Sequence, residues 1–381
     1  MILLLLISER GLAGKMIKKA LLLIFTLCLL MTTLSPVAAQ TGIEIEAPGE
    51  SAQAIFPDSI DFNLSIEGAA GITEVRLHYI VERESFANVT SEVIVDIVPG
   101  TQVEASWSLD MIKTGGLPSG TIIEYWWTVT DTSGNKYITT REQLSFDDNR
   151  YSWQSLSAGN ISLYWYYGSE SFAQELMTAA QQALIKLAQD TGATLEDPVR
   201  IYIYADSYAL RGAMINAQDW AGGAAYVSEN AIAIGISPGN IEWGKRAVVH
   251  ELAHLVTHQM VSNPYSYIPT WLNEGISMYA EGEMESTYYN YLSQAVAGDS
   301  LISVQTLSSP FSAYSSKSYL SYAQSLSLVE FLIENYGREK ISQLLSVFKQ
   351  GSTYDDAFIS VYGFDVDGLD ALWREYAEAK Y

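Results

Sequence analysis

Residues Val248 to His258 read VVHELAHLVTH and hold three of the four histidines in the chain. Apolar residues at helical spacing predict a helix here, and side chains four residues apart share one face of it. The segment HELAH, from His250 to His254, fits the H-E-x-x-H pattern, in which two imidazoles hold one zinc ion and the glutamate, here Glu251, acts on water. The five letters alone also fit a buried helix with polar residues along one edge.

A third ligand follows further along the chain. The segment PTWLNEGISMYAEG predicts a second apolar helix that begins just after Pro269. It places Glu274 twenty residues after His254, and this carboxylate would complete a His-His-Glu zinc site with an open position for water. His258 does not suit the third position, because eight residues of helix separate it from His250 by about 12 Å of rise and about 80° of rotation. We expect His258 on the helix face or behind the ligands.

HELAH followed by WLNEG at this spacing resembles the gluzincin metallopeptidases, in particular the peptidase-MA-like group related to the M1 aminopeptidases. The resemblance extends over roughly the last 230 residues. It implies a zinc cofactor held by His250, His254 and Glu274, with Glu251 as general base and a peptide or protein as substrate.

The segment YAQSLSLVEFLIENYG, which starts at Tyr322, resembles the M1 segment in which a tyrosine hydroxyl donates to the oxyanion of the reaction. The resemblance therefore gives Tyr322 that role. The chain has 25 tyrosines, and Tyr319 and Tyr279 are nearby alternatives.

One part of the M1 pattern is missing, because no Gly-Ala-Met-Glu-Asn stretch precedes the HELAH helix. The glutamate that anchors a substrate amino terminus in that pattern has no matched position, so the sequence does not decide between endopeptidase and exopeptidase action. Two segments, AGGAAYV and AIAIGI, are candidates for an edge strand that pairs with an extended peptide. Both also fit ordinary strands of a sheet.

In the first part of the chain, apolar residues recur at every second position and not at helical spacing. Runs such as IDFNLSIEG, EVRLHYIVE and IIEYWWTVTD alternate apolar and polar residues between turn signals. This pattern predicts an antiparallel β-sandwich over residues 40–147, which resembles an immunoglobulin-like or fibronectin-III-like module and is a candidate for contact with a cell surface or a protein. Residues 148–381 are predicted to form the gluzincin domain, a small mixed sheet followed by helices. The predicted fold class is α+β.

A leader is predicted at residues 1–39. The pattern predicts a start at Met16, after which two lysines precede an apolar run that ends in small residues, as is typical of a secretory signal peptide cleaved after Ala39. Cys28, the single cysteine, lies in this run, so the exported chain has no disulfide. No later stretch is long and apolar enough to span a membrane. The predicted location is secreted or periplasmic.

The net charge of the chain excludes one class of binding partner. The chain has 21 basic and 44 acidic residues, a formal net charge of −23, which argues against nucleic acid as a partner. We therefore expect an exported zinc metallopeptidase. The alternative is a surface-binding or adhesive protein whose zinc domain is structural or weakly catalytic.

Overall fold

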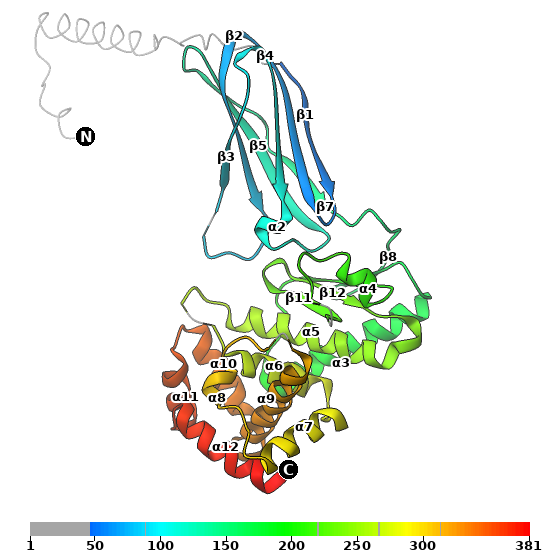
Figure 1. The fold of residues 1–381 in the computed structure, drawn as a ribbon, viewed down its shortest axis with the longest axis vertical. Helices are drawn as coiled ribbons and strands as arrows, with labels where there is room; N and C mark the ends of the chain where they lie inside the picture. Colours follow the sequence, from blue (N-terminus) through cyan, green and yellow to red (C-terminus); the bar gives the residue numbers. More distant parts are fainter. Residues whose placement is uncertain (1–45, 88, 219–220, 266, 313) are drawn as a thin grey trace, which may run out of the picture.

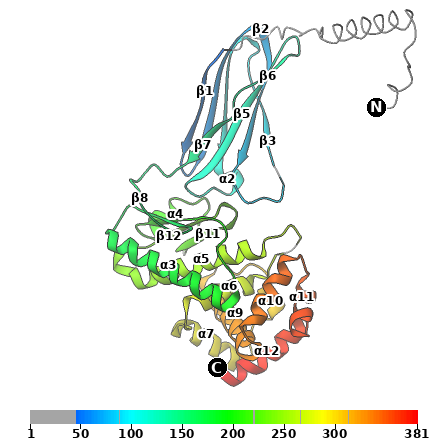
Figure 2. The same ribbon diagram turned by 180° about the vertical axis from the view of Figure 1, so that it is seen from behind.

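The computed structural model describes residues 46–87, 89–218, 221–265, 267–312 and 314–381. The predicted signal peptide, residues 1–39, lies outside these ranges. Figures 1 and 2 show a β region at one end, a small sheet with helices in the middle, and a helical part at the other end, where the C-terminus lies. The β-rich beginning and helical end agree with the predicted α+β class.

One long strand organises the N-terminal β region. Strand β2 (Ser59–Val81) pairs antiparallel with β1 and β4 over residues 59–67 and with β3 and β5 over residues 72–81. Its alternate residues Phe62, Leu64 and Ile66 are buried in the core of this region, as the alternating pattern predicts. Hydrogen bonds through β2 link the described strands into one sheet, so the two-sheet sandwich and the immunoglobulin or fibronectin-III label stay predictions. The other elements are β1 (Glu46–Ile55), β3 (Ser91–Val95), β4 (Gly100–Asp110), α2 (Met111–Thr114), β5 (Thr121–Asp131), β6 (Lys136–Ile138) and β7 (Glu142–Phe146).

A second sheet begins the C-terminal part. Its described strands follow the order β11-β12-β10-β9-β8. The inner strands β9, β10 and β12 are parallel, whereas β8 and β11 pair antiparallel at the two edges. Of the two segments considered for an edge strand, AGGAAYV therefore supplies it and AIAIGI lies inside the sheet. The strands are β8 (Gln154–Ala158), β9 (Ile161–Trp165), β10 (Val199–Tyr204), β11 (Gly223–Tyr226) and β12 (Ala231–Gly235).

Helices α3 and α5 pack on one face of this sheet, the short α4 packs on the other face, and further helices continue to the C-terminus. The long helix α3 begins at an N-cap, Ser169, and ends at Gly192 in the left-handed conformation, the usual signals for a helix start and stop. It packs beside α5. The helices are α3 (Glu170–Thr191), α4 (Ser207–Arg211), α5 (Ile241–Val261), α6 (Thr270–Glu281), α7 (Ser286–Ala297), α8 (Val304–Leu307), α9 (Ser315–Tyr336), α10 (Arg338–Lys349), α11 (Tyr354–Tyr362) and α12 (Val366–Lys380).

Helices α6 and α9 approach each other closely at Gly275. A Cβ atom added there would lie 2.4 Å from the backbone oxygen of Ser325 and 2.7 Å from Cγ2 of Val329. Only glycine fits at such a crossing. The contact fixes α6, which carries Glu274, against α9, which carries Tyr322.

Among the residues that the structure describes, none of the helices combines the length and the apolar character needed to cross a bilayer.

Candidate metal centre

Three side chains from two helices converge on one point. His250 and His254 lie one turn apart on α5, and Glu274 reaches them from α6. The Nε2 atoms of the two histidines are 3.2 Å apart, and Oε2 of Glu274 lies 3.3 Å and 3.4 Å from them. Among the described residues, this is the cluster of ligand-type side chains that suits a metal ion.

The spacing of these atoms fits zinc. Ligand atoms about 2.0–2.1 Å from a tetrahedral zinc ion lie about 3.3 Å from one another, which matches the triangle between His250, His254 and Glu274. The Oε2 atom of Glu274 is buried, and no hydrogen bond from the described residues satisfies it. A buried carboxylate oxygen without a donor is costly, and a cation at this point would remove that cost. The residues present therefore fit zinc.

Two residues that the sequence analysis did not single out orient the imidazoles. Oε1 of Glu281 lies 2.7 Å from Nδ1 of His250, and Oγ of Ser277 lies 3.1 Å from Nδ1 of His254. Contacts of this kind fix the ring orientation and leave Nε2 for the metal. The sequence did hold a signal, because Ser277 and Glu281 follow Glu274 by three and seven residues and so share its helix face.

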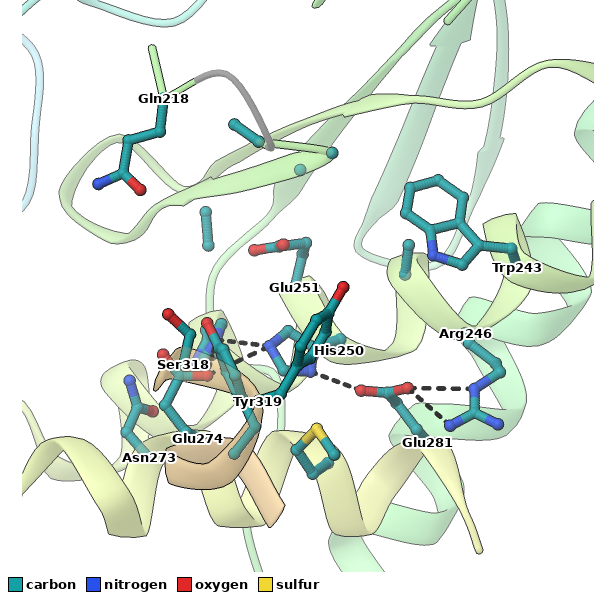
Figure 3. A pocket seen from close by; sticks show the side chains of 18 of the residues that line it. Gln218, Trp243, Arg246, His250, Glu251, Asn273, Glu274, Glu281, Ser318 and Tyr319 are labelled. Carbon is teal, nitrogen blue, oxygen red and sulfur yellow. Dashed lines mark hydrogen bonds and ion pairs between the residues drawn. The ribbon is translucent and has the colours of Figure 1, made fainter. Parts of the chain in front are cut away.

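Arg246 holds Glu281 in turn. Its guanidinium contacts Oε2 of Glu281 at 3.1 Å and Oε1 of Glu285 at 3.0 Å. Figure 3 shows the resulting row from Arg246 through Glu281 to His250. The carboxylate of Glu281 is thus bound on both sides, which restricts its movement.

Glu251 lies on α5, and its side chain, labelled in Figure 3, reaches the edge strand β11. A Cβ atom added to Gly223, the first residue of β11, would lie 2.6 Å from Oε1 of Glu251. The absence of a side chain at Gly223 therefore leaves the space that the Glu251 carboxylate occupies. Burial raises the pKa of Glu251, against the opposing effect of the two imidazoles, which moves this carboxylate toward the range that suits a general base.

The pKa values of the three candidate ligands, His250, His254 and Glu274, are shifted by one another's charges. Burial alone would lower the pKa of His250 and His254, but neighbouring carboxylates, Glu274 foremost, raise both above the ordinary value. Burial would raise the pKa of Glu274, and the two imidazoles hold it below its usual range. The metal-free site thus attracts protons to the positions that a divalent cation would fill.

The three ligands and Glu251 line a cavity of about 700 Å³. The edge strand, the segment before it, and helices α5, α6, α7 and α9 form its walls. Tyr322, Tyr319 and Tyr288 lie on the same wall, and the Tyr322 ring lies 6.3 Å from that of His250. Burial, followed by the charge of Glu274, raises the pKa of Tyr322, which keeps its hydroxyl protonated and able to donate.

The structure separates the alternatives for the tyrosine. Tyr322 and Tyr319 line the cavity, but Tyr279 does not. Nζ of Lys186 instead lies over the Tyr279 ring, 5.0 Å from the ring centre. Tyr288, which the sequence analysis did not consider, contacts both Tyr319 and Tyr322 edge-on.

His258 lies apart from the ligands. Its Nε2 atom is 3.2 Å from Oε2 of Glu84 in the N-terminal β region. The fourth histidine, His78, stacks on Trp126 in that region.

Comparisons with known proteins give one strong result. A family model described as the Peptidase MA superfamily matches residues 179–379, more than half of the chain. No curated protein matches.

Among solved structures, an M1 zinc metallopeptidase from Deinococcus radiodurans is 12% identical, covers 85% of this chain and 91% of its own, and has a TM-score of 0.37. A carbohydrate-binding module of family 56, described as a β-1,3-glucan binding domain, is 21% identical, covers 25% of this chain and 95% of its own, and has a TM-score of 0.16. Both TM-scores lie below 0.5, so the family assignment rests on the family model.

Proposed function

We propose that this chain, which belongs to the Peptidase MA superfamily, hydrolyses peptide bonds with the help of zinc. The observation that carries the proposal is the triangle of His250, His254 and Glu274 atoms, whose spacing fits tetrahedral zinc. The presence of Glu251 beside His250 favours an enzyme, because a purely structural zinc site has no use for a general base.

The proposed mechanism assigns one role to each residue. Zinc supplies Lewis acidity and makes water an effective nucleophile near neutral pH. Glu251 accepts a proton from the attacking water on its carboxylate and delivers it to the leaving amine. Tyr322 donates from its hydroxyl to the oxyanion that forms at the former carbonyl.

We assign peptide binding to the edge strand β11. An extended peptide can add to an exposed edge by backbone hydrogen bonds, which do not depend on side-chain identity. Strand β11 ends the described sheet, and its residues Gly223 and Ala225 line the cavity. A substrate chain paired there would pass Glu251 and the proposed zinc position.

The experiment has two readouts, metal content and hydrolysis of a mixed peptide library with and without a chelator. We expect about one zinc per chain and hydrolysis that the chelator abolishes and added zinc restores. Glu251→Gln should retain zinc and lose hydrolysis. The control is Glu242→Gln on the same helix, whose side chain is 83% exposed and which should remain active. Purified protein without zinc, or an active Glu251→Gln variant, would contradict the proposal.

Export belongs to the same proposal. The pattern of residues 1–39 supports a leader cleaved after Ala39. Amino-terminal sequencing of protein recovered outside the cytoplasm should begin at Gln40. Recovery of the full-length chain in the cytoplasm would contradict export.

A further inference from the structure

The edge strand β11 belongs to a hairpin whose turn contacts the N-terminal β region. After Tyr226 the chain forms a single 3-10 turn, Val227–Glu229, and returns as β12. The backbone N–H of Glu84, in the segment after β2, donates to the carbonyl of Ser228 in this turn at 2.6 Å. A group from the N-terminal region thus holds the turn that ends the proposed substrate strand.

The side chain of Glu84 makes a second contact. Its Oε2 atom is buried without a hydrogen-bond partner among the described residues, and Nε2 of His258 lies 3.2 Å from it. His258 lies one turn after His254 on α5. Glu84 therefore contacts the hairpin turn through its backbone and helix α5 through its side chain.

The segment that enters β11 is also held by the N-terminal half. Ile215 lines the cavity and packs against the core of the N-terminal β region. Gly116 lies so close that an added Cβ would be 3.1 Å from Cγ1 of Ile215. The chain on both sides of the edge strand is therefore held from the N-terminal side.

From these contacts we propose that the N-terminal β region positions the substrate-binding strand, and that Glu84 and His258 are the positioning residues of this contact. The proposal rests on the peptidase function above. It gives the N-terminal region a part in substrate binding that acts through β11, and it gives a role to a histidine that lies on α5 beyond His250 and His254. Neither residue touches the reacting atoms, so their loss should weaken binding of an extended peptide more than it slows chemistry.

The test compares full-length variants at Glu84 and His258. With the best peptide from the library as substrate, Glu84→Ala and His258→Ala should each raise KM about threefold to tenfold and change kcat less than about twofold. Zinc content should stay that of the unmodified protein. Glu84→Gln keeps a polar side chain of the same length beside His258 and should restore part of the loss. The matched control is Glu82→Gln, which removes the same charge from an exposed side chain in the same segment.

Two further measurements separate positioning from general destabilisation. The double variant Glu84→Ala/His258→Ala should be no worse than either single variant, because both remove one contact. Hydrogen exchange of the amides in residues 223–230 should speed up in both single variants at an unchanged unfolding temperature, since local opening reports local contacts.

The two proposals fail in different ways. If the unmodified protein cleaves no peptide, the peptidase function is wrong, and hydrogen exchange alone then decides whether Glu84 and His258 position the strand. If the protein is active but the two alanine variants have an unchanged KM, the positioning role is wrong. Unchanged exchange in residues 223–230 would overturn it as well.

Discussion

Oε1 of Glu281 lies 2.7 Å from Nδ1 of His250, on the side of the imidazole opposite to the proposed zinc position. Helix α6 therefore supplies both a candidate zinc ligand, Glu274, and the carboxylate that contacts the candidate ligand His250 from α5. The two residues are two helical turns apart on one face, so the short helix α6 determines much of the geometry of the site.

We expect Glu281→Gln to weaken zinc binding about 10-fold to 100-fold, the usual effect of losing such a contact. The amide cannot hold the imidazole as firmly, and it also leaves Arg246 without one of its partners. Competition with a chromogenic chelator measures the affinity. Glu283→Gln, two residues further along and exposed, is the control. Equal zinc affinity in both variants would show that Glu281 does not orient His250.

Gly223→Ala should lower kcat without removing zinc. The new Cβ would lie 2.6 Å from Oε1 of Glu251, and the flexible glutamate side chain would move before the backbone does. A displaced general base transfers its proton less well, and a general base typically accelerates a reaction about 100-fold to 10,000-fold. Gly239→Ala, where an added Cβ meets nothing within 4 Å, should have normal activity. Full activity of Gly223→Ala would mean that Glu251 acts from another position.

Tyr322→Phe should reduce kcat more than KM, because the hydroxyl donates mainly to charge that develops during the reaction. The loss of one such donor typically costs about 100-fold to 1,000-fold in kcat. Tyr319→Phe tests the other candidate on the cavity wall, and Tyr279→Phe, outside the cavity lining, is the control. If Tyr319→Phe shows the larger loss of kcat, the oxyanion role belongs to Tyr319.

The metal-free protein should become less stable as pH rises above about 6.5, the ordinary pKa of histidine. The folded protein raises the pKa of His250 and His254, so their stabilising charge is fully present below the unfolded pKa and is lost as pH rises through the raised folded pKa. Zinc requires neutral imidazoles, so the zinc-loaded protein should gain stability over the same range.

The measurement is the unfolding temperature from pH 6 to 9, once with chelator and once with zinc. It should fall with pH in the metal-free protein and rise with pH in the zinc-loaded protein. His254→Gln should flatten the metal-free slope, because it removes one of the two raised groups. A metal-free protein whose unfolding temperature rises with pH would contradict the prediction.

Gly275→Ala should destabilise the fold by about 1–3 kcal/mol, the usual range for overpacking. The added Cβ would lie 2.4 Å from a backbone oxygen of α9, so the two helices would have to separate. Denaturant unfolding measures the loss, with Gly239→Ala again as the control. An unchanged free energy of unfolding would mean that α6 and α9 are not held as closely as described.

Much of the fold follows from local pattern. The change from alternating to helical periodicity separates the β-rich beginning from the helical end, and caps such as Ser169 and Gly192 mark helix α3. Strand pairing could not be predicted in the same way. A period of two shows which residues face inward, but it does not show which strand lies beside which. The sequence therefore did not reveal that β2 pairs with β1, β3, β4 and β5.

The sequence alone predicts His250 and His254 as zinc ligands and Glu251 as the base beside them, because the three share one helix and their relative positions follow from 3.6 residues per turn. It also favoured Glu274 from the spacing of WLNEG. Only the tertiary structure decided what lies around them: Glu84 beside His258, Gly223 against Glu251, and Tyr279 outside the cavity. These contacts join segments far apart in the chain, and no local period encodes the distance between two elements that meet only on folding.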